Sequence, residues 1–376
     1  MPVRYTLYGA EMSLYSGKVR SYLRKKGLAF NEVAASVKTY RDVIIPETGV
    51  KFIPVVRTPE GKFLQDTSVI IKEIDSQHPD HSALPATPRQ RLVAELLEVY
   101  ADEWLILPAM HYRWNFPEKN QPFIYREFGR FVLPWAPAFI RGWVGKKAGA
   151  RFKGAVTSLG ITAKTIPAIE ASYGALLDDL QAHFLKHQFL LGSKPCIADF
   201  GFIGPLYAHL YRDPYPSALM RKRAPAVARW VERMMDTNAY LQQGSLLAND
   251  EIPKTIEPIL KRMGAEQYPV LKASNKALNE WRRDTPHALG KDIEVARRIG
   301  THKFTLDGVK DKRVILPYSL WMLQRVLESR YVFELINDYE FDDWLEKVGL
   351  GGILNFTFDQ PMHRIDNKLY FRKVMA

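Results

Sequence analysis

The chain has a single cysteine, Cys196, among its 376 residues. One thiol cannot form an internal disulfide or supply the several sulfur ligands of a cysteine-based zinc site. This cysteine usage is typical of a reducing compartment, so we expect a cytoplasmic protein. We also expect no bound metal. His183 and His187 have the four-residue spacing of paired zinc ligands, but no third ligand accompanies them, and the pair indicates a solvated helix face.

Long apolar runs are also missing. No run of about 18 uncharged apolar residues occurs, so no transmembrane helix is predicted. The first residues lack the apolar core and cleavage site of a signal peptide. Apolar residues make up 47% and charged residues 25% of the chain, as in ordinary globular proteins. The length predicts two or three domains.

Acidic residues are absent between Phe128 and Ile169, in a chain whose formal net charge is +12. Aromatic residues are interleaved there with basic ones, which are Arg130, Arg141, Lys146, Lys147, Arg151, Lys153 and Lys164. We interpret the segment as a helix pair with a basic, solvated face. An anion-attracting rim of a ligand cleft and a patch for membrane surfaces or nucleic acid are the alternatives. Because the common nucleic-acid-binding motifs are absent, we expect no nucleic-acid partner.

The hydrophobic pattern divides the chain into three regions. Residues 1–80 alternate short strand-like and helix-like segments, which predicts an α/β layer. After a proline-rich linker, residues 88–245 carry long helical stripes and predict an all-helical domain. Residues 250–376 combine helical stripes with an alternating segment around Asp307-Gly308, which indicates a hairpin. The predicted fold class is therefore α/β plus all-α, with a mixed α/β extension.

A hydroxyl lies between the first predicted strand and the first predicted helix. The segment "MSLYSGKVRSYLRKKGL" places Ser13 at or just before the first helical turn. A serine there caps the helix by accepting a backbone hydrogen bond. Ser16 is the alternative cap. The pattern alone leaves open whether Ser13 is a cap or serves chemistry.

Two other strand ends have notable residues. In "FIPVV", Pro54 belongs at a strand start or edge. A cis bond after Ile53 would turn the Ile53 backbone N–H and C=O toward a neighbouring cleft. In "LQDTSVI", Thr67 caps a helix and Asp66 favours its positive end. Alternatively, Thr67 and the helix N–H groups bind a carboxylate while Asp66 binds an ammonium group, as an amino-acid-like ligand requires.

These segments together resemble the thioredoxin-like domain of the glutathione transferases. "SLYSGKVRSYLRKKGL" is similar to the first loop and helix of that family, "FIPVV" to its cis-proline turn, and "GKFLQDTSVI" to its Glu-Ser helix start. "FLLGSKPCIADFGFIG" resembles the N-capping box of its all-helical domain. The chain departs from the family at Leu14, where proline is common, at the shorter Asp66, and at Cys196, where Ser or Thr is usual. Residues 250–376 have no counterpart in the common two-domain transferase.

The resemblance implies that residues 1–80 bind glutathione as co-substrate. Ser13 would donate a hydrogen bond to the glutathione thiolate, with Tyr8, Ser16 and Tyr15 as rivals. The Ile53 backbone before Pro54 would pair with the cysteinyl unit, and Asp66 and Thr67 would hold the γ-glutamyl group. The glycyl carboxylate would meet one of three cations, Lys38, Arg41 or Lys51.

The resemblance also places a second substrate between the domains. An aromatic-rich set suits an apolar electrophile there, although core packing is the other interpretation: Tyr15, Trp104, Met110, His111, Tyr112 and Trp114. The implied protein is a homodimeric detoxification enzyme that joins glutathione to a small apolar electrophile. The alternative is a non-catalytic glutathione-binding or scaffold protein of the same fold. Attachment to a membrane surface through residues 128–153 is a weaker third hypothesis.

Overall fold

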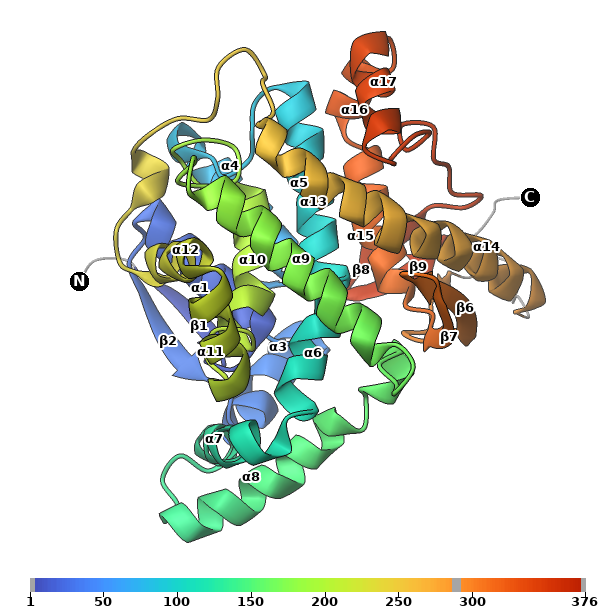
Figure 1. Ribbon diagram of the computed structural model, residues 1–376. Coiled ribbons are helices and arrows are strands. Elements are labelled where there is room, and N and C mark those ends of the chain that lie inside the picture. The colour runs from blue at the N-terminus through green and yellow to red at the C-terminus, as the bar shows by residue number, and fades with distance from the viewer. Residues whose placement is uncertain (1–3, 286–291, 373–376) are drawn as a thin grey trace.

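The computed structural model describes residues 4–285 and 292–372, and Figure 1 shows them as three adjoining parts. The first part is a sheet with helices, the second is all-helical, and the third mixes helices with short strands. One continuous hydrophobic core contains residues of all three parts. The predicted fold class is confirmed, and the C-terminal extension shares the core with the rest of the molecule.

The N-terminal part is a four-stranded mixed sheet in the order β2-β1-β3-β4. The strands are β1 (Tyr5–Gly9), β2 (Phe30–Ala34), β3 (Val55–Arg57) and β4 (Phe63–Gln65). β1 runs parallel to β2, whereas β3 is antiparallel to both β1 and β4. The helices are α1 (Leu14–Lys26), α2 (Val37–Thr39), α3 (Ile45–Thr48) and α4 (Thr67–Gln77), with a π-helical turn at Tyr40–Ile44. The predicted α/β layer of alternating strands and helices is present in this part.

Helix α1 is buried on nearly every side because it lies between the sheet and the helical part. Val19, Tyr22 and Leu23 are fully buried, as the apolar spacing predicts. Gly27 ends the helix in the left-handed conformation with φ of 75°. Because α1 is covered on both sides, Lys18 and Lys25 are also buried, and each lies beside a carboxylate.

The second part consists of eight helices, of which α10 is the central one. The helices are α5 (Pro88–Glu103), α6 (Ile106–Trp114), α7 (Pro117–Val132), α8 (Ala138–Lys153), α9 (Ile166–Phe184), α10 (Ile197–Ala208), α11 (Pro214–Arg223) and α12 (Pro225–Met235). Helix α10 packs against α5 and α1 and so joins the first two parts. Several of these helices have proline in the first turn, where its missing N–H costs no helical hydrogen bond.

The prediction of a solvated face around His183 is wrong. His183 is completely buried in α9, with Nδ1 2.7 Å from Thr255 Oγ1 and Nε2 3.1 Å from the Phe189 carbonyl oxygen. Burial lowers the pKa of His183 to about 4. Across residues 4–285 and 292–372, no group of three or more His, Cys, Asp or Glu side chains could hold a metal ion.

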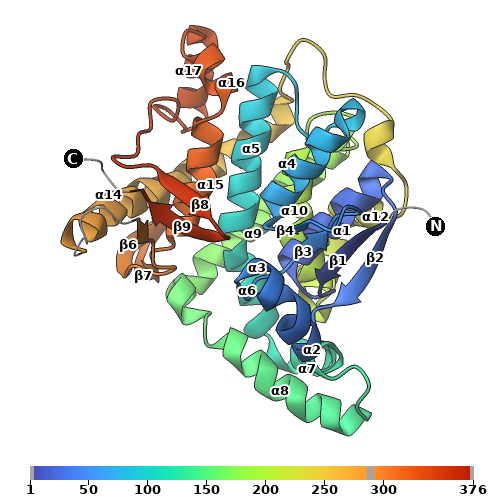
Figure 2. The same ribbon diagram turned by 180° about the vertical axis from the view of Figure 1, so that it is seen from behind.

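The extension packs along helix α5. Its elements are α13 (Glu257–Arg262), a π-helical turn (Met263–Gln267), α14 (Tyr268–Asp284), β5 (Ile293–Glu294), β6 (Thr301–Leu306), β7 (Val309–Val314), α15 (Pro317–Leu327), α16 (Arg330–Leu335), α17 (Tyr339–Lys347), β8 (Met362–Ile365) and β9 (Lys368–Phe371). α15 and α16 contact α5, and Figure 2 shows β8 and β9 reaching toward the N-terminal part. The predicted hairpin is β6–β7, with positive φ at both Asp307 and Gly308.

Within the described part of the chain, no helix combines the length and the apolar character needed to span a bilayer.

Candidate functional site

Three strand ends meet at one edge of the N-terminal sheet. Tyr8 on β1 is the partner of Val55 on β3, and Val55 is the partner of Gln65 on β4. Because β3 runs antiparallel to its neighbours, its first residue lies beside the last residues of β1 and β4. The loop after β1, the residues before β3 and the start of α4 therefore lie together. These segments hold Ser13, Ile53 and Asp66.

Ser13 is the N-cap of α1. Its backbone is extended, and its Oγ accepts a hydrogen bond from the Ser16 backbone N–H at 3.3 Å. Ser16, the alternative cap, lies within the first turn and accepts from the Ala10 N–H at 3.2 Å. The half-buried Ser13 hydroxyl keeps its proton for another acceptor, since in this contact it only accepts.

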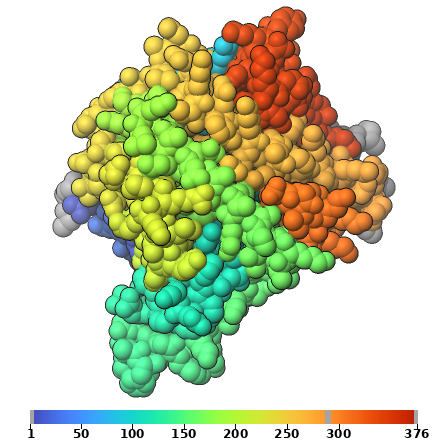
Figure 3. Space-filling model, in the orientation of Figure 1, coloured from blue at the N-terminus to red at the C-terminus, as the bar shows by residue number. Residues whose placement is uncertain are grey.

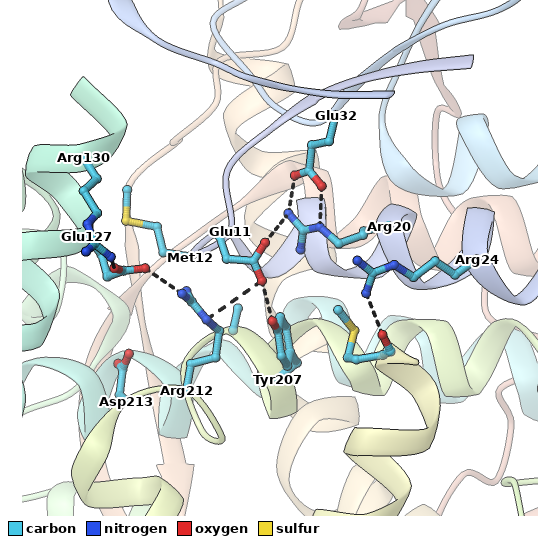
Figure 4. A network of polar contacts seen from close by, with 12 residues as sticks. Glu11, Met12, Arg20, Arg24, Glu32, Glu127, Arg130, Tyr207, Arg212 and Asp213 are labelled. Carbon is cyan, nitrogen blue, oxygen red and sulfur yellow. Dashed lines mark hydrogen bonds and ion pairs between the residues drawn. The ribbon is translucent and has the colours of Figure 1, made fainter. Parts of the chain in front are cut away.

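The loop before Ser13 is fixed from behind by Glu11. Figure 4 shows the Glu11 carboxylate between Arg20, Tyr207 and Arg212. The Tyr207 hydroxyl donates to Glu11, and the Arg20 guanidinium lies 3.2 Å from it. These cations and the Tyr207 hydroxyl hold the pKa of Glu11 below its ordinary value despite its partial burial. The sequence patterns did not reveal this anchor, because two of its partners, Tyr207 and Arg212, come from the helical part.

A second anchor holds the Met12 carbonyl. Arg113 on α6 donates to the Met12 carbonyl oxygen at 3.2 Å. The same guanidinium forms a buried pair with Asp213, with Nε 2.7 Å from a carboxylate oxygen. The loop is therefore attached to the helical domain on both sides of its turn, and it presents Ser13 rigidly at the sheet edge.

The peptide bond between Ile53 and Pro54 is cis. Val55 begins strand β3, so Ile53 lies just outside the ladder. Within the described residues, the Ile53 backbone N–H and C=O have no hydrogen-bond partner. This half-buried residue therefore presents one free donor and one free acceptor at the sheet edge.

Asp66, rather than Thr67, caps helix α4. One Asp66 carboxylate oxygen accepts from the backbone N–H groups of Ser68 and Val69, each at 3.1 Å. This corrects the assignment of the cap to Thr67. Asp66 has φ of 85°, a left-handed conformation that is costly for a residue with a side chain and that concentrates at functional sites. Thr67 is the first helical residue, and neither its hydroxyl nor its N–H has a partner among the residues described.

The extension reaches Asp66 through the start of α15. The Tyr318 hydroxyl donates to the second Asp66 carboxylate oxygen. Burial and the Asp66 charge raise the pKa of Tyr318 well above its ordinary value. Next to it, the Ser319 hydroxyl donates to Glu103 at the end of α5, at 2.5 Å. Both contacts come from residues for which the family resemblance offered no counterpart.

Two more segments of the extension border the same edge. Arg364 on β8 donates to the Gln65 carbonyl oxygen at 2.9 Å. The Asn367 amide donates to the Thr48 carbonyl oxygen at 2.8 Å. Arg297 lies with its guanidinium carbon 4.3 Å from the centre of the Phe52 ring, adjacent to Ile53. A cation from the extension thus lies against the residue that precedes Ile53.

A buried ionic cluster lies beneath the site. Lys18 Nζ is 2.6 Å from Glu98 and 2.5 Å from Asp102, and Ser68 donates to Glu98 at 2.6 Å. Burial raises the pKa of Asp102 to about 7, whereas the charges of Lys18 and Arg325 overcome burial and lower that of Glu98 to about 2. The cluster ties α1, α4 and α5 together immediately behind the capped helix ends.

The three predicted cations are exposed at the surface. Arg41 forms an ion pair with its neighbour Asp42, and Lys38 and Lys51 are exposed on either side of the π-helical turn and α3. Their role at a glycyl carboxylate stays a prediction, and Arg297 is an additional candidate that sequence patterns missed. Tyr8, a rival of Ser13, is buried with Ile44 and Val55 in a cluster separate from the core that contains α1.

Most of the predicted second-substrate residues lie in the core. Met110, His111, Tyr112 and Trp114 are all buried, which favours the core-packing interpretation for these four. Trp104 lines two small cavities, of about 10 and about 20 Å³. Tyr15 donates to the Asp102 carbonyl oxygen at 3.1 Å, and burial raises its pKa well above the ordinary value.

Cys196 is a buried helix-start residue. Its backbone N–H donates to the Asp199 carboxylate at 2.9 Å, and burial raises the pKa of the thiol well above its ordinary value. A neutral, inaccessible thiol is not a nucleophile. Cys196 is therefore a core thiol at the start of α10.

Comparison with protein families gives two matches. Residues 7–82 match the model described as glutathione S-transferase, N-terminal domain, and residues 162–238 match the model described as glutathione S-transferase, C-terminal domain. A search of curated proteins finds no significant match.

Solved structures are similar to this chain over about two thirds of its length. A tau-class glutathione S-transferase from mango, Mangifera indica, is 18% identical, with 67% of this chain and 94% of that one covered and a TM-score of 0.41. The beta-etherase LigF from Sphingobium sp. strain SYK-6 is 16% identical, with 63% and 97% covered and a TM-score of 0.44. A Methylobacterium radiotolerans glutathione S-transferase, in complex with glutathione sulfonate, is 19% identical, with 66% and 100% covered and a TM-score of 0.39.

Proposed function

This chain belongs to the glutathione S-transferase superfamily, and we propose that it is a glutathione transferase that activates the glutathione thiol at Ser13. The observation that supports this proposal most is that three groups able to hydrogen-bond a ligand lie at one edge of the sheet. These are the Ser13 hydroxyl at a helix start, the unpaired Ile53 backbone, and the Asp66–Thr67 pair at a second helix start. A tripeptide with a thiol, an ammonium group and two carboxylates has matching groups for all of them.

The proposed chemistry depends on the ionisation of the thiol. A free thiol ionises near pH 8.5, and only its thiolate is a good nucleophile. A hydrogen bond from Ser13 and the positive end of α1 both favour the thiolate over the thiol. The thiol proton passes to solvent, and the thiolate then attacks an electrophilic carbon of the second substrate and forms a carbon–sulfur bond. In a substitution, the leaving group departs with the electron pair of the bond that breaks. In an addition, the π bond opens and its other carbon takes a proton from solvent. Ser13 donates a hydrogen bond throughout and is not itself consumed.

The remaining groups would hold glutathione in place. The Ile53 N–H and C=O would form backbone hydrogen bonds with the cysteinyl unit, in the manner of a β-ladder next to β3. Asp66 would accept from the γ-glutamyl ammonium group, and the Thr67 hydroxyl with the N–H groups of α4 would bind the γ-glutamyl carboxylate. Arg297 would add a cation for a carboxylate of the tripeptide.

The second substrate is proposed to be a small apolar electrophile next to Tyr15 and Trp104. Both residues lie at the junction of α1 and α5 with the extension. We retain the homodimer as a proposal of the same kind. Light scattering of the purified chain measures the mass in solution directly, and a monomeric mass at assay concentration would contradict it.

Turnover with a panel of electrophiles tests the proposed function. Ser13→Ala removes the hydroxyl, whereas Ser36→Ala removes the equivalent cap of α2, where the Ser36 hydroxyl accepts from the Thr39 N–H. We expect kcat/KM to fall by about 10²-fold or more for Ser13→Ala, as when a donor to a developing anion is lost. Ser36→Ala should retain the wild-type value. Equal activity of Ser13→Ala and wild type would refute the role of Ser13.

The second candidate is a non-catalytic glutathione-binding protein. The contact between Tyr318 and Asp66 favours this second candidate. The extension already occupies one oxygen of the Asp66 carboxylate, which is the group proposed to bind the γ-glutamyl ammonium. Binding of glutathione without any lowering of its thiol pKa would support this candidate over the transferase.

A further inference from the structure

Helices α7 and α8 form a hairpin that stands out from the body of the molecule. Figure 1 shows α8 at the lower edge, and Figure 3 shows the hairpin as a projection below the rest of the surface. The base of α7 contacts α6 and α11, and α8 packs on α7. The turn between them, residues 133–137, forms the tip.

The two helices of the hairpin touch backbone to backbone. A Cβ atom on Gly129 would lie 2.1 Å from the Arg141 carbonyl oxygen, and one on Gly145 would lie 1.9 Å from the Tyr125 carbonyl oxygen. Such close approach leaves no room for large side chains between the helices. The large side chains of α8 must therefore point outward.

Three aromatic side chains spaced four residues apart lie on this outer surface. Trp135, Phe139 and Trp143 are 81%, 78% and 61% exposed, and Ile140 beside them is 37% exposed. Scattered exposed apolar residues are ordinary, but a contiguous group on a projecting element marks a surface that binds another phase or partner. Within the described residues, the indole N–H groups of Trp135 and Trp143 donate no hydrogen bond.

Basic residues follow the aromatic ones along the same helix. Lys146, Lys147 and Arg151 are exposed, and the Lys147 ammonium lies 3.8 Å from the centre of the Trp143 ring. No acidic residue occurs between Phe128 and Ile169. The hairpin thus has an apolar, aromatic tip followed by a basic region.

We propose that the α7–α8 hairpin docks the protein on an anionic lipid bilayer. Trp135, Phe139 and Trp143 would enter the boundary between headgroups and acyl chains, where aromatic side chains are favoured. Lys146, Lys147 and Arg151 would contact lipid phosphates, so the charge of the bilayer complements that of the hairpin.

Other occupants fit these features less well. A second copy of the chain would bring the same positive charge to the same surface. A nucleic acid would match the basic region, but it offers no apolar phase for Phe139 and Ile140 at the tip. The proposal is independent of the proposed glutathione chemistry, because it uses no residue of that site.

Co-sedimentation of the full chain with vesicles tests the proposal. At low salt, we expect binding to vesicles of phosphatidylcholine with phosphatidylglycerol, weaker binding to phosphatidylcholine alone, and release by added salt. Trp135→Ser with Phe139→Ser, and separately Lys146→Glu with Lys147→Glu, should each reduce binding about tenfold or more. The matched control is Phe333→Ser with Tyr339→Ser, two side chains that are 69% and 76% exposed on α16 and α17. This control should bind like wild type.

Several outcomes would overturn the proposal. These are no sedimentation with anionic vesicles, equal losses in the control variant, or concentration-dependent self-association that the hairpin substitutions abolish. Binding of single-stranded RNA with the same dependence on the hairpin, without vesicle binding, would assign the surface to nucleic acid instead. Unchanged melting temperatures of the variants ensure that losses come from the surface and not from unfolding.

Discussion

The Tyr318 hydroxyl donates a hydrogen bond to the Asp66 carboxylate across 252 positions of sequence. Asp66 caps α4 with its other oxygen, so both oxygens of the carboxylate accept hydrogen bonds within the protein. An ionised carboxylate has about four acceptor positions, which leaves room for one further donor from a ligand. The C-terminal extension is therefore part of the wall around the proposed glutathione site.

Replacing Tyr318 by phenylalanine should weaken glutathione binding. The substitution removes one charge-assisted hydrogen bond that orients Asp66, and such a bond is worth enough to raise the Kd for glutathione by about 3–10-fold. Isothermal titration of wild type and Tyr318→Phe measures this directly. Tighter binding in the variant would show instead that Tyr318 competes with the ligand for Asp66.

Removing the Arg297 cation should also weaken glutathione binding. Arg297 lies against Phe52, which precedes Ile53, and its sequence neighbour Arg298, which is also exposed, provides a control of the same charge. We expect Arg297→Ala to raise the KM for glutathione by about 3–10-fold at low salt and less at high salt, because the cation is partly exposed and screened. Arg298→Ala should leave KM unchanged. Equal effects of both substitutions would indicate a general charge effect and not a specific contact.

The buried Asp102 should make stability depend on pH. Its pKa is raised from 3.8 to about 7, so the folded chain keeps a proton that the unfolded chain has already released. Stability from this group is therefore greatest at low pH and falls as pH rises from about 4 to about 7.

Asp102→Asn should lack this contribution. Relative to wild type, the unfolding free energy of the variant should rise as the pH increases from about 4 to about 7.5. Thermal melting of both proteins across this range measures the difference, and Asp80→Asn at an exposed site is the control. A constant difference between Asp102→Asn and wild type would contradict the raised pKa.

Local sequence signals predicted the local structure of the three segments that meet at the sheet edge. Ser13, Pro54 and Asp66 each follow or precede a short strand, and cap and turn chemistry acts over a few residues, so their positions could be inferred from neighbours. The choice between Asp66 and Thr67 as the cap could not, since it depends on the positive φ of Asp66.

Long-range packing explains what sequence patterns missed. Tyr318, Arg297 and Arg364 reach the site only because the extension docks along α5, and no local signal encodes that docking. His183 was assigned to a solvated face because no third metal ligand accompanies it and His187. In the interior, Thr255 and Phe189 lie within hydrogen-bond distance of its two ring nitrogens.

The ionisation of bound glutathione tests the central claim most directly. The ultraviolet absorbance of the thiolate is followed against pH for glutathione bound to wild type, Ser13→Ala and Ser36→Ala. We predict that the bound thiol titrates at least about one unit below the free value near 8.5 in wild type and Ser36→Ala, and returns toward that value in Ser13→Ala. Identical titrations in wild type and Ser13→Ala, or no thiolate signal on binding at neutral pH, would contradict the account.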